Sequence, residues 1–247
     1  ALPICVIMSL IITARRAKKG LLPFTFGKEN LKPVFQLLKK IVRMAIPLAF
    51  NELILGLSFL VISAIFNTLG VAASAAVGVA GKLAGFIMIF TSAFSQSLAS
   101  FVAQNYGAGD LKRAKRAWYL GMLIACAVGL LMCALIFLFP DFFSGIFSKD
   151  PEVIRLGADF TKAYAVDTVF SAAMFCTCGY LNGCGLTNIT LAQCMIGVAV
   201  RIPFAFLLMS LSSGNMFITG LCVPISTIAQ LIFLLIYMKY ASKKNLA

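Results

Sequence analysis

The chain has 247 residues, of which 61% are hydrophobic, and its mean hydropathy is +0.99. Soluble domains are about half apolar, whereas long apolar runs fill most of this sequence, so its composition predicts an all-α, polytopic membrane helix bundle. The net charge of +13 lies in short clusters between the apolar runs, which excludes a nucleic-acid-binding surface and indicates the positive-inside pattern of membrane proteins.

The N-terminal segment is apolar over residues 1–13, which is too short to cross a bilayer of about 30 Å. Its basic residues follow the apolar run instead of preceding it, so the segment is not a signal peptide. We therefore interpret residues 1–13 as the end of a truncated transmembrane helix. Residues 14–43 are basic and contain Pro23 and Pro33, and we predict that they form a cytoplasmic inter-lobe linker.

The remainder of the chain, residues 44–247, is predicted to form a lobe of six full transmembrane helices. The expected spans are 44–68, 75–104, 117–139, 153–180, 190–211 and 216–238. Asp110 and Asp150 stand where helix N-caps are needed, and Pro151 suits the first turn of the helix that follows. Most lysines and arginines fall in 14–43, in 105–116 and in the tail, which predicts that the linker and the C-terminus are cytoplasmic.

Three ionisable residues stand out inside the apolar spans: Glu52, Lys82 and Asp167. An ionised group at mid-bilayer costs several kcal/mol, so such residues usually face a cavity or a partner. We expect Glu52 and Asp167 to face a shared cavity and to bind a proton or a small cation, with Lys82 as a candidate counter-ion of Asp167. The alternative is a buried ion pair that only fixes helix register. Asn51, which adjoins Glu52 in sequence, is a further cavity candidate, and helical spacing from Lys82 and Asp167 adds Gln96, Tyr164 and Ser171.

The other spans are poorer in polar groups, apart from Gln193, Arg201 and Gln230. Eight cysteines lie in or beside apolar spans, and the sequence contains no histidine. The cysteines are expected to be small packing residues, and neither a metal site nor a disulfide framework is predicted.

Three segments, taken in order, resemble the multidrug and toxic compound extrusion family. They are "SLASFVAQNYGAGDLKRAKRAWYLG", "FPDFFSGIFSKDPEVIRLGADFTKAYAVD" and "GYLNGCGLTNITLAQCMIGVAVRIPFAFLLM". The resemblance implies a secondary antiporter with twelve helices in two lobes, of which this chain would be the C-terminal half. Such transporters export cationic or amphipathic compounds in exchange for sodium ions or protons, without an organic cofactor.

By the same resemblance, Glu52 and Asp167 are candidates for cation coupling. The expected partners are a small-molecule substrate, the lipid bilayer of a bacterial plasma membrane and the missing N-terminal lobe. A flippase for lipid-linked or polysaccharide substrates is an alternative within the same superfamily, but it would need several basic cavity residues, and only Lys82 and Arg201 are available. A membrane enzyme that uses the two acids is disfavoured, because no nucleophile–base pair accompanies them. A membrane scaffold is a third alternative, in which neutralising Glu52 would change stability and not transport.

Overall fold

The computed structural model describes residues 2–18, 35–68, 70–212 and 215–243. It divides the chain into two units, residues 1–43 and 44–247. The first unit contains helix α1, which runs from Leu2 to Lys18 and so continues past the predicted end at residue 13. Most of the predicted linker, including Pro23 and Pro33, lies outside the described residues. Its last part is helical, because α2 begins at Phe35 and ends at Asn67.

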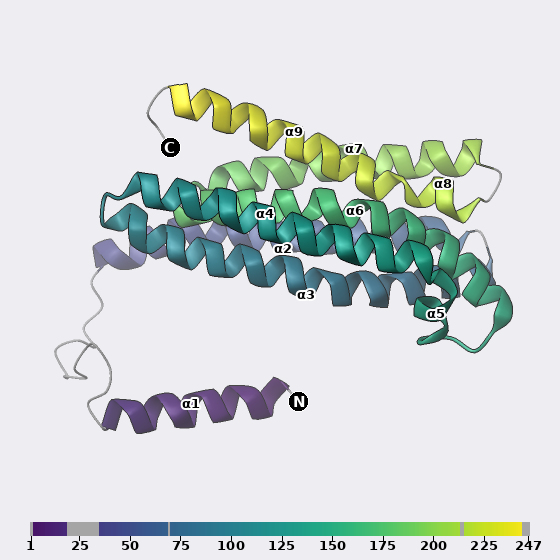
Figure 1. Cartoon of the computed structure of the whole chain (residues 1–247), viewed down its shortest axis with the longest axis horizontal. Helices are drawn as coiled ribbons and strands as arrows, with labels where there is room; N and C mark the ends of the chain where they lie inside the picture. The colour runs from purple at the N-terminus through teal and green to yellow at the C-terminus, as the bar shows by residue number, and fades with distance from the viewer. Residues whose placement is uncertain (1, 19–34, 69, 213–214, 244–247) are drawn as a thin grey trace. The chain divides into compact units, whose positions relative to one another are not determined.

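The second unit is a bundle of long helices without a strand in its described part, which confirms the predicted all-α fold (Figure 1). After α2 the order is α3 (Val71–Gly107), α4 (Leu111–Leu138), α5 (Pro140–Gly145), α6 (Pro151–Gly183), α7 (Thr187–Leu211), α8 (Met216–Gly220) and α9 (Cys222–Lys243). The six predicted spans correspond to α2, α3, α4, α6, α7 and the pair α8–α9. The short α5 was not predicted.

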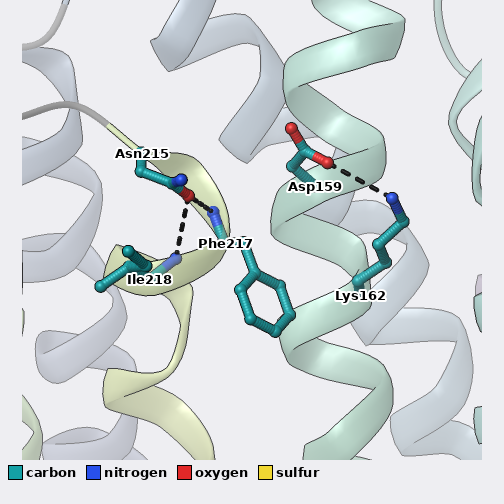
Figure 2. A network of polar contacts seen from close by, with 5 residues as sticks. All are labelled: Asp159, Lys162, Asn215, Phe217 and Ile218. Carbon is teal, nitrogen blue, oxygen red and sulfur yellow. Dashed lines mark hydrogen bonds and ion pairs between the residues drawn. The ribbon is translucent and has the colours of Figure 1, made fainter. Parts of the chain in front are cut away.

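Local signals set most of the helix ends. The carboxylate of Asp110 accepts a hydrogen bond from the Arg113 backbone N–H at 3.0 Å, and Asp150 accepts one from the Glu152 N–H at 2.9 Å, which confirms both predicted caps. Asn215 caps α8 by accepting bonds from the backbone N–H groups of Phe217 and Ile218, as Figure 2 shows. Side-chain acceptors at these positions satisfy N–H groups that no preceding helical turn can reach.

The last predicted span is interrupted between α8 and α9, at Leu221. Pro224 explains the position, because proline lacks the N–H that would bond to the carbonyl of Gly220 and its ring crowds that carbonyl. The chain recovers its helical hydrogen bonding at once, since the Ile225 N–H reaches the Leu221 carbonyl at 3.1 Å.

Helix α6 is the central element of the unit and packs mainly against α3, α4 and α9 (Figure 1). Small residues allow the close approach to α3: a Cβ at Gly179 would lie 3.0 Å from the Ser95 Cα, and one at Gly183 would lie 2.8 Å from the Val102 Cβ. Trp118 of α4 stacks near Tyr180 of α6, with ring centroids 5.5 Å apart, inside the main apolar cluster.

Five helices among the described residues are long and apolar enough to cross a membrane: α2, α3, α4, α7 and α8–α9 taken together. The remaining predicted span, 153–180, corresponds to α6, which has 33 residues but is less apolar than these five helices. Its surroundings account for the difference, because a helix that contacts other helices on most sides is shielded from lipid by them. In the N-terminal half of α6, Asp159 and Lys162 form an ion pair at 3.4 Å (Figure 2).

Candidate functional site

A cavity of about 100 Å³ lies among α2, α3, α6, α7 and α9 of the second unit. Three charged residues line it, two acids and one base: Glu52, Asp167 and Arg201. Its polar lining also includes Asn51, Thr91, Tyr164, Thr168, Ser171, Gln193, Thr227 and Gln230. Polar groups of this density inside an apolar bundle mark a site for a polar or charged ligand.

Asp167 lies at the middle of the cavity-lining face of α6. Tyr164 and Ser171 lie about one turn before and after it, so all three share this face, as the helical spacing predicted. The Asp167 Oδ1 atom is buried and has no hydrogen-bond partner among the described residues. The Thr227 hydroxyl lies within reach of the carboxyl group, and Arg201 is the cation whose charge acts on it. One acceptor atom of this buried acid is thus left unpaired by the described residues.

Glu52 and Asn51 reach the same cavity from α2. The Glu52 side chain is exposed, which places it at the rim, whereas Asp167 lies deeper. The Asn51 carbonyl accepts a long bond from the Cys194 thiol, with 3.6 Å between sulfur and oxygen, and this contact joins α2 to α7. Both acids line one cavity, as predicted, and their role in cation coupling stays a prediction.

Arg201 is the basic residue of the cavity. It is only 6% exposed, its Nε donates to the Ser226 hydroxyl at 3.0 Å, and its guanidinium lies over the Phe59 ring at 5.4 Å from the centroid. Sequence reasoning noted Arg201 only as one polar residue in an apolar span and as a basic residue that a flippase would need. An arginine in such a span was the signal for a cavity residue.

Two of the predicted cavity residues, Lys82 and Gln96, are exposed on α3 and do not line this cavity. Lys82 and Asp167 form no ion pair within 4.0 Å in the described part of the chain, and the cation whose charge acts on the acid is Arg201. Helix α3 turns another face inward, on which Thr91 lies with Ile87 and Ala84. Successive residues of a helix are about 100° apart around its axis. A set of residues one or two positions away in the sequence therefore faces a different neighbouring helix.

Two glutamines close one wall of the cavity. Gln193 of α7 donates to the side-chain oxygen of Gln230 of α9, and also contacts the Met174 sulfur at 3.2 Å. The Gln230 amide in turn donates to the Ser226 carbonyl at 3.2 Å. Buried polar groups of this kind fix the relative positions of helices when they are satisfied by one another. The sequence showed both glutamines as isolated polar residues without revealing that they meet.

A second cavity of about 320 Å³ adjoins the first and lies among α2, α3 and α6. The two cavities share four lining residues: Phe59, Ala84, Met88 and Tyr164. The second is mainly apolar, with Ser63 and Tyr164 as its hydroxyl-bearing residues. A charged compartment that continues into an apolar one matches the two ends of an amphipathic molecule.

Residues 47–207 match the sequence model of the MatE family, over more than half of the chain. The chain belongs to the MATE family. The matched region contains most of the MATE cavity, including Asn51, Glu52, Asp167 and Arg201, while the α9 wall lies beyond it.

Named relatives come from bacteria and from mammals. The FAD transporter of Shewanella oneidensis is 34% identical over 116 residues, which are 47% of this chain and 26% of that protein. The probable multidrug resistance protein NorM of Thermotoga maritima is 26% identical over 75% of this chain and 40% of its own length. Multidrug and toxin extrusion protein 1 of Homo sapiens is 25% identical over 67% of this chain and 30% of its own length. The MATE chain thus spans less than half of the length of each of these relatives.

Solved structures agree with this fold. A MATE crystallised in complex with MaL6 superimposes with a TM-score of 0.87 at 17% identity, over 97% of this chain and 55% of that one. A MOP superfamily transporter from Pyrococcus furiosus, described as having a binding pocket of reverse polarity, superimposes with a TM-score of 0.76. Its sequence is 17% identical, and the match covers 81% of this chain and 44% of that one. At this identity the likeness establishes the fold alone, and the ligand of this MATE cavity has to be argued from its own residues.

Proposed function

We propose that this chain forms the C-terminal lobe of a secondary active antiporter that exports cationic or amphipathic small molecules in exchange for sodium ions or protons. The observation that carries the proposal is the shared cavity, in which Glu52 and Asp167 lie beside an adjoining apolar cavity. The acids offer a site for a cation, and the apolar cavity offers a surface for the body of an amphipathic substrate.

The coupling follows from the position of the acids. A carboxylate in a poorly hydrated cavity attracts a proton or a cation more strongly than one in water, because little solvent competes for it. Occupancy of Asp167 by the coupling ion changes the charge that a substrate meets in the same small cavity. Ion and substrate then favour different states of a transporter that alternates between inward-facing and outward-facing forms.

The membrane setting is part of the proposal. The chain lies in a bacterial plasma membrane, with its basic segments, the 105–116 connection and the C-terminus on the cytoplasmic side. A second lobe of similar size completes the transporter and the opposite wall of the substrate site; the support is that the chain covers 55% and 44% of the two solved transporter structures described above. Flippase activity is the weaker proposal, because Arg201 is the one basic residue among the described cavity residues.

The test is export from cells. The protein is expressed, as its gene encodes it, in an efflux-deficient bacterium, and ethidium retention is followed with and without sodium and with a protonophore. We expect the wild type to lower retention and Glu52→Gln and Asp167→Asn to abolish the effect at matched expression. The ion dependence identifies the coupling ion. FAD belongs in a second substrate panel, because one relative is named a FAD transporter.

Asp159→Asn is the matched control for these variants. Asp159 lies on the same helix as Asp167, but it pairs with Lys162 and does not line the cavity. Export that survives in the control and is lost in Asp167→Asn assigns the effect to the cavity. Normal export by both cavity variants would refute the assignment of the two acids, and an inactive wild type would count against multidrug export and favour the flippase test next.

A further inference from the structure

Arg201 has donor capacity that the protein does not use. Its side chain is 94% shielded, its Nε bonds to Ser226, and its Nη1 is buried without a hydrogen-bond partner among the residues that the structure describes. A guanidinium has five N–H donors and stays protonated in proteins. A buried donor left unpaired is costly, so Nη1 is a group that a ligand can satisfy.

The nearby acid does not satisfy Arg201 directly. The charge of Arg201 acts on Asp167, but the two side chains do not form an ion pair. The one ion pair within 4.0 Å in the described part of the chain joins Lys162 to Asp159. The Asp167 Oδ1 atom is also unpaired. Arginine and carboxylate groups that meet usually form a bidentate pair, which would fill the free positions of both. Asp167 and Arg201 thus line the same cavity, and each has one buried atom without a hydrogen-bond partner among the described residues.

The size of the cavity limits what can bind between these groups. A volume of about 100 Å³ is small against the roughly 300–1,000 Å³ of drug-sized sites. It accommodates a single charged group, such as a carboxylate or a phosphate. The remainder of the molecule extends into the adjoining apolar cavity, where Phe59 belongs to both linings and lies under the guanidinium.

We propose that Arg201 is a substrate-binding residue that takes an anionic oxygen group, a carboxylate or a phosphate, of the exported molecule. The proposal rests on the proposed function, in that it treats the cavity as the substrate site, and it adds to the proposed substrates amphipathic molecules that carry an acidic group. Asp167 and Glu52 remain the cation site, so a zwitterion finds a partner for each of its charges. The planar guanidinium, held by Ser226 and by the Phe59 ring, is oriented before the ligand arrives.

The test compares pairs of ligands in which one member has an anionic group that the other lacks. Fluorescence polarisation measures binding to the purified protein, as its gene encodes it, in detergent. The carboxylate pair is a zwitterionic rhodamine and its methyl ester, and the phosphate pair is flavin mononucleotide and riboflavin. In the wild type we expect, in at least one pair, that the member with the carboxylate or phosphate binds tenfold or more tightly than the member without it, because charge-assisted bonds are the strong ones.

The variants assign that preference to Arg201. Arg201→Gln should remove the preference while changing the affinity for the rhodamine ester less than threefold, and Arg201→Lys should keep part of it, since the charge remains and the planar donor geometry is lost. A preference confined to one pair identifies the carboxylate or the phosphate as the group bound. A wild type that binds the member without the anionic group as tightly as the member with it, in both pairs, overturns the proposal, whatever the variants do.

The same measurements separate this proposal from the proposed function. One outcome is that the rhodamine ester binds in a way that depends on Asp167 and not on Arg201, while the rhodamine with the free carboxylate binds no more tightly than the ester. This outcome supports the cation site and refutes the anion site. A preference that persists in Arg201→Gln, in a monodisperse preparation that still binds the ester, also refutes it. Loss of ethidium export in Asp167→Asn bears on the proposed function alone.

Discussion

Replacing Gly179 by alanine tests the close packing of α6 against α3. The new Cβ would lie 3.0 Å from the Ser95 Cα and 3.1 Å from its carbonyl carbon, where ordinary contacts begin near 3.4 Å. These are backbone atoms within α3, so they cannot turn aside as a flexible side chain can. The two helices must separate, and every contact along their interface weakens with the distance.

The magnitude follows from two opposing terms. Overpacking costs about 1–3 kcal/mol, and a rigid backbone neighbour argues for the upper end. Alanine is favoured over glycine in a helix by up to about 1 kcal/mol. The net loss is therefore about 2 kcal/mol, which corresponds to a decrease in Tm of about 4–8 °C for a chain of this size. The assay is the monodisperse fraction that survives heating in detergent, measured by size-exclusion chromatography.

Gly56→Ala is the matched control, because a Cβ at Gly56 of α2 meets nothing within 4 Å and this residue lines neither cavity. We expect its Tm to equal or exceed that of the wild type. Equal Tm values for Gly179→Ala and Gly56→Ala would refute the reasoning, since the two substitutions share the same chemistry and differ in their neighbours. A lowered Tm in both would point to a general intolerance of alanine.

Two further substitutions test single hydrogen-bonding groups. Asn215→Ala removes the acceptor for two backbone N–H groups at the start of α8 and should cost about 1 kcal/mol, seen as a Tm about 2–4 °C lower; an unchanged Tm would show that the cap is dispensable. Thr168→Val removes the bond from the Thr168 hydroxyl to the Gly129 carbonyl of α4, which is 3.0 Å long, at almost constant volume. It should cost about 0.6 kcal/mol, as interhelical bonds in membranes do on average, and a loss several times larger would contradict a single-bond explanation.

The helix ends could be predicted because their causes are local. Asp110 and Asp150 act on N–H groups two or three residues away, so the sequence contains the whole interaction. The interruption before α9 has an equally local cause in Pro224, but a proline within an apolar run is compatible with either a kink or a break, and its outcome depends on the packing around it.

The cavity was predictable where one helix face is distinctive. In the part of α6 after Lys162, Asp167 is the one charged residue, and its face with Tyr164 and Ser171 lines the cavity. On α3 small and polar residues occur on several faces, so composition did not select one. The orientation of α3 depends instead on its contacts with Gly179 and Gly183, which are distant in sequence. The error in placing Lys82 follows from this long-range dependence.

The same contacts separate the part of the lobe that sets its stability from the part proposed to bind ligands. Helices α3, α4 and α6 meet through glycines and a shared apolar cluster, whereas the charged residues of the cavity belong to α2, α6 and α7. Conservative changes of charged residues in that lining leave the close contacts of α6 unaltered. A loss of binding in Asp167→Asn without a fall in Tm would therefore report on the ligand site. The fall in Tm of Gly179→Ala shows how large the change is when helix packing is disturbed.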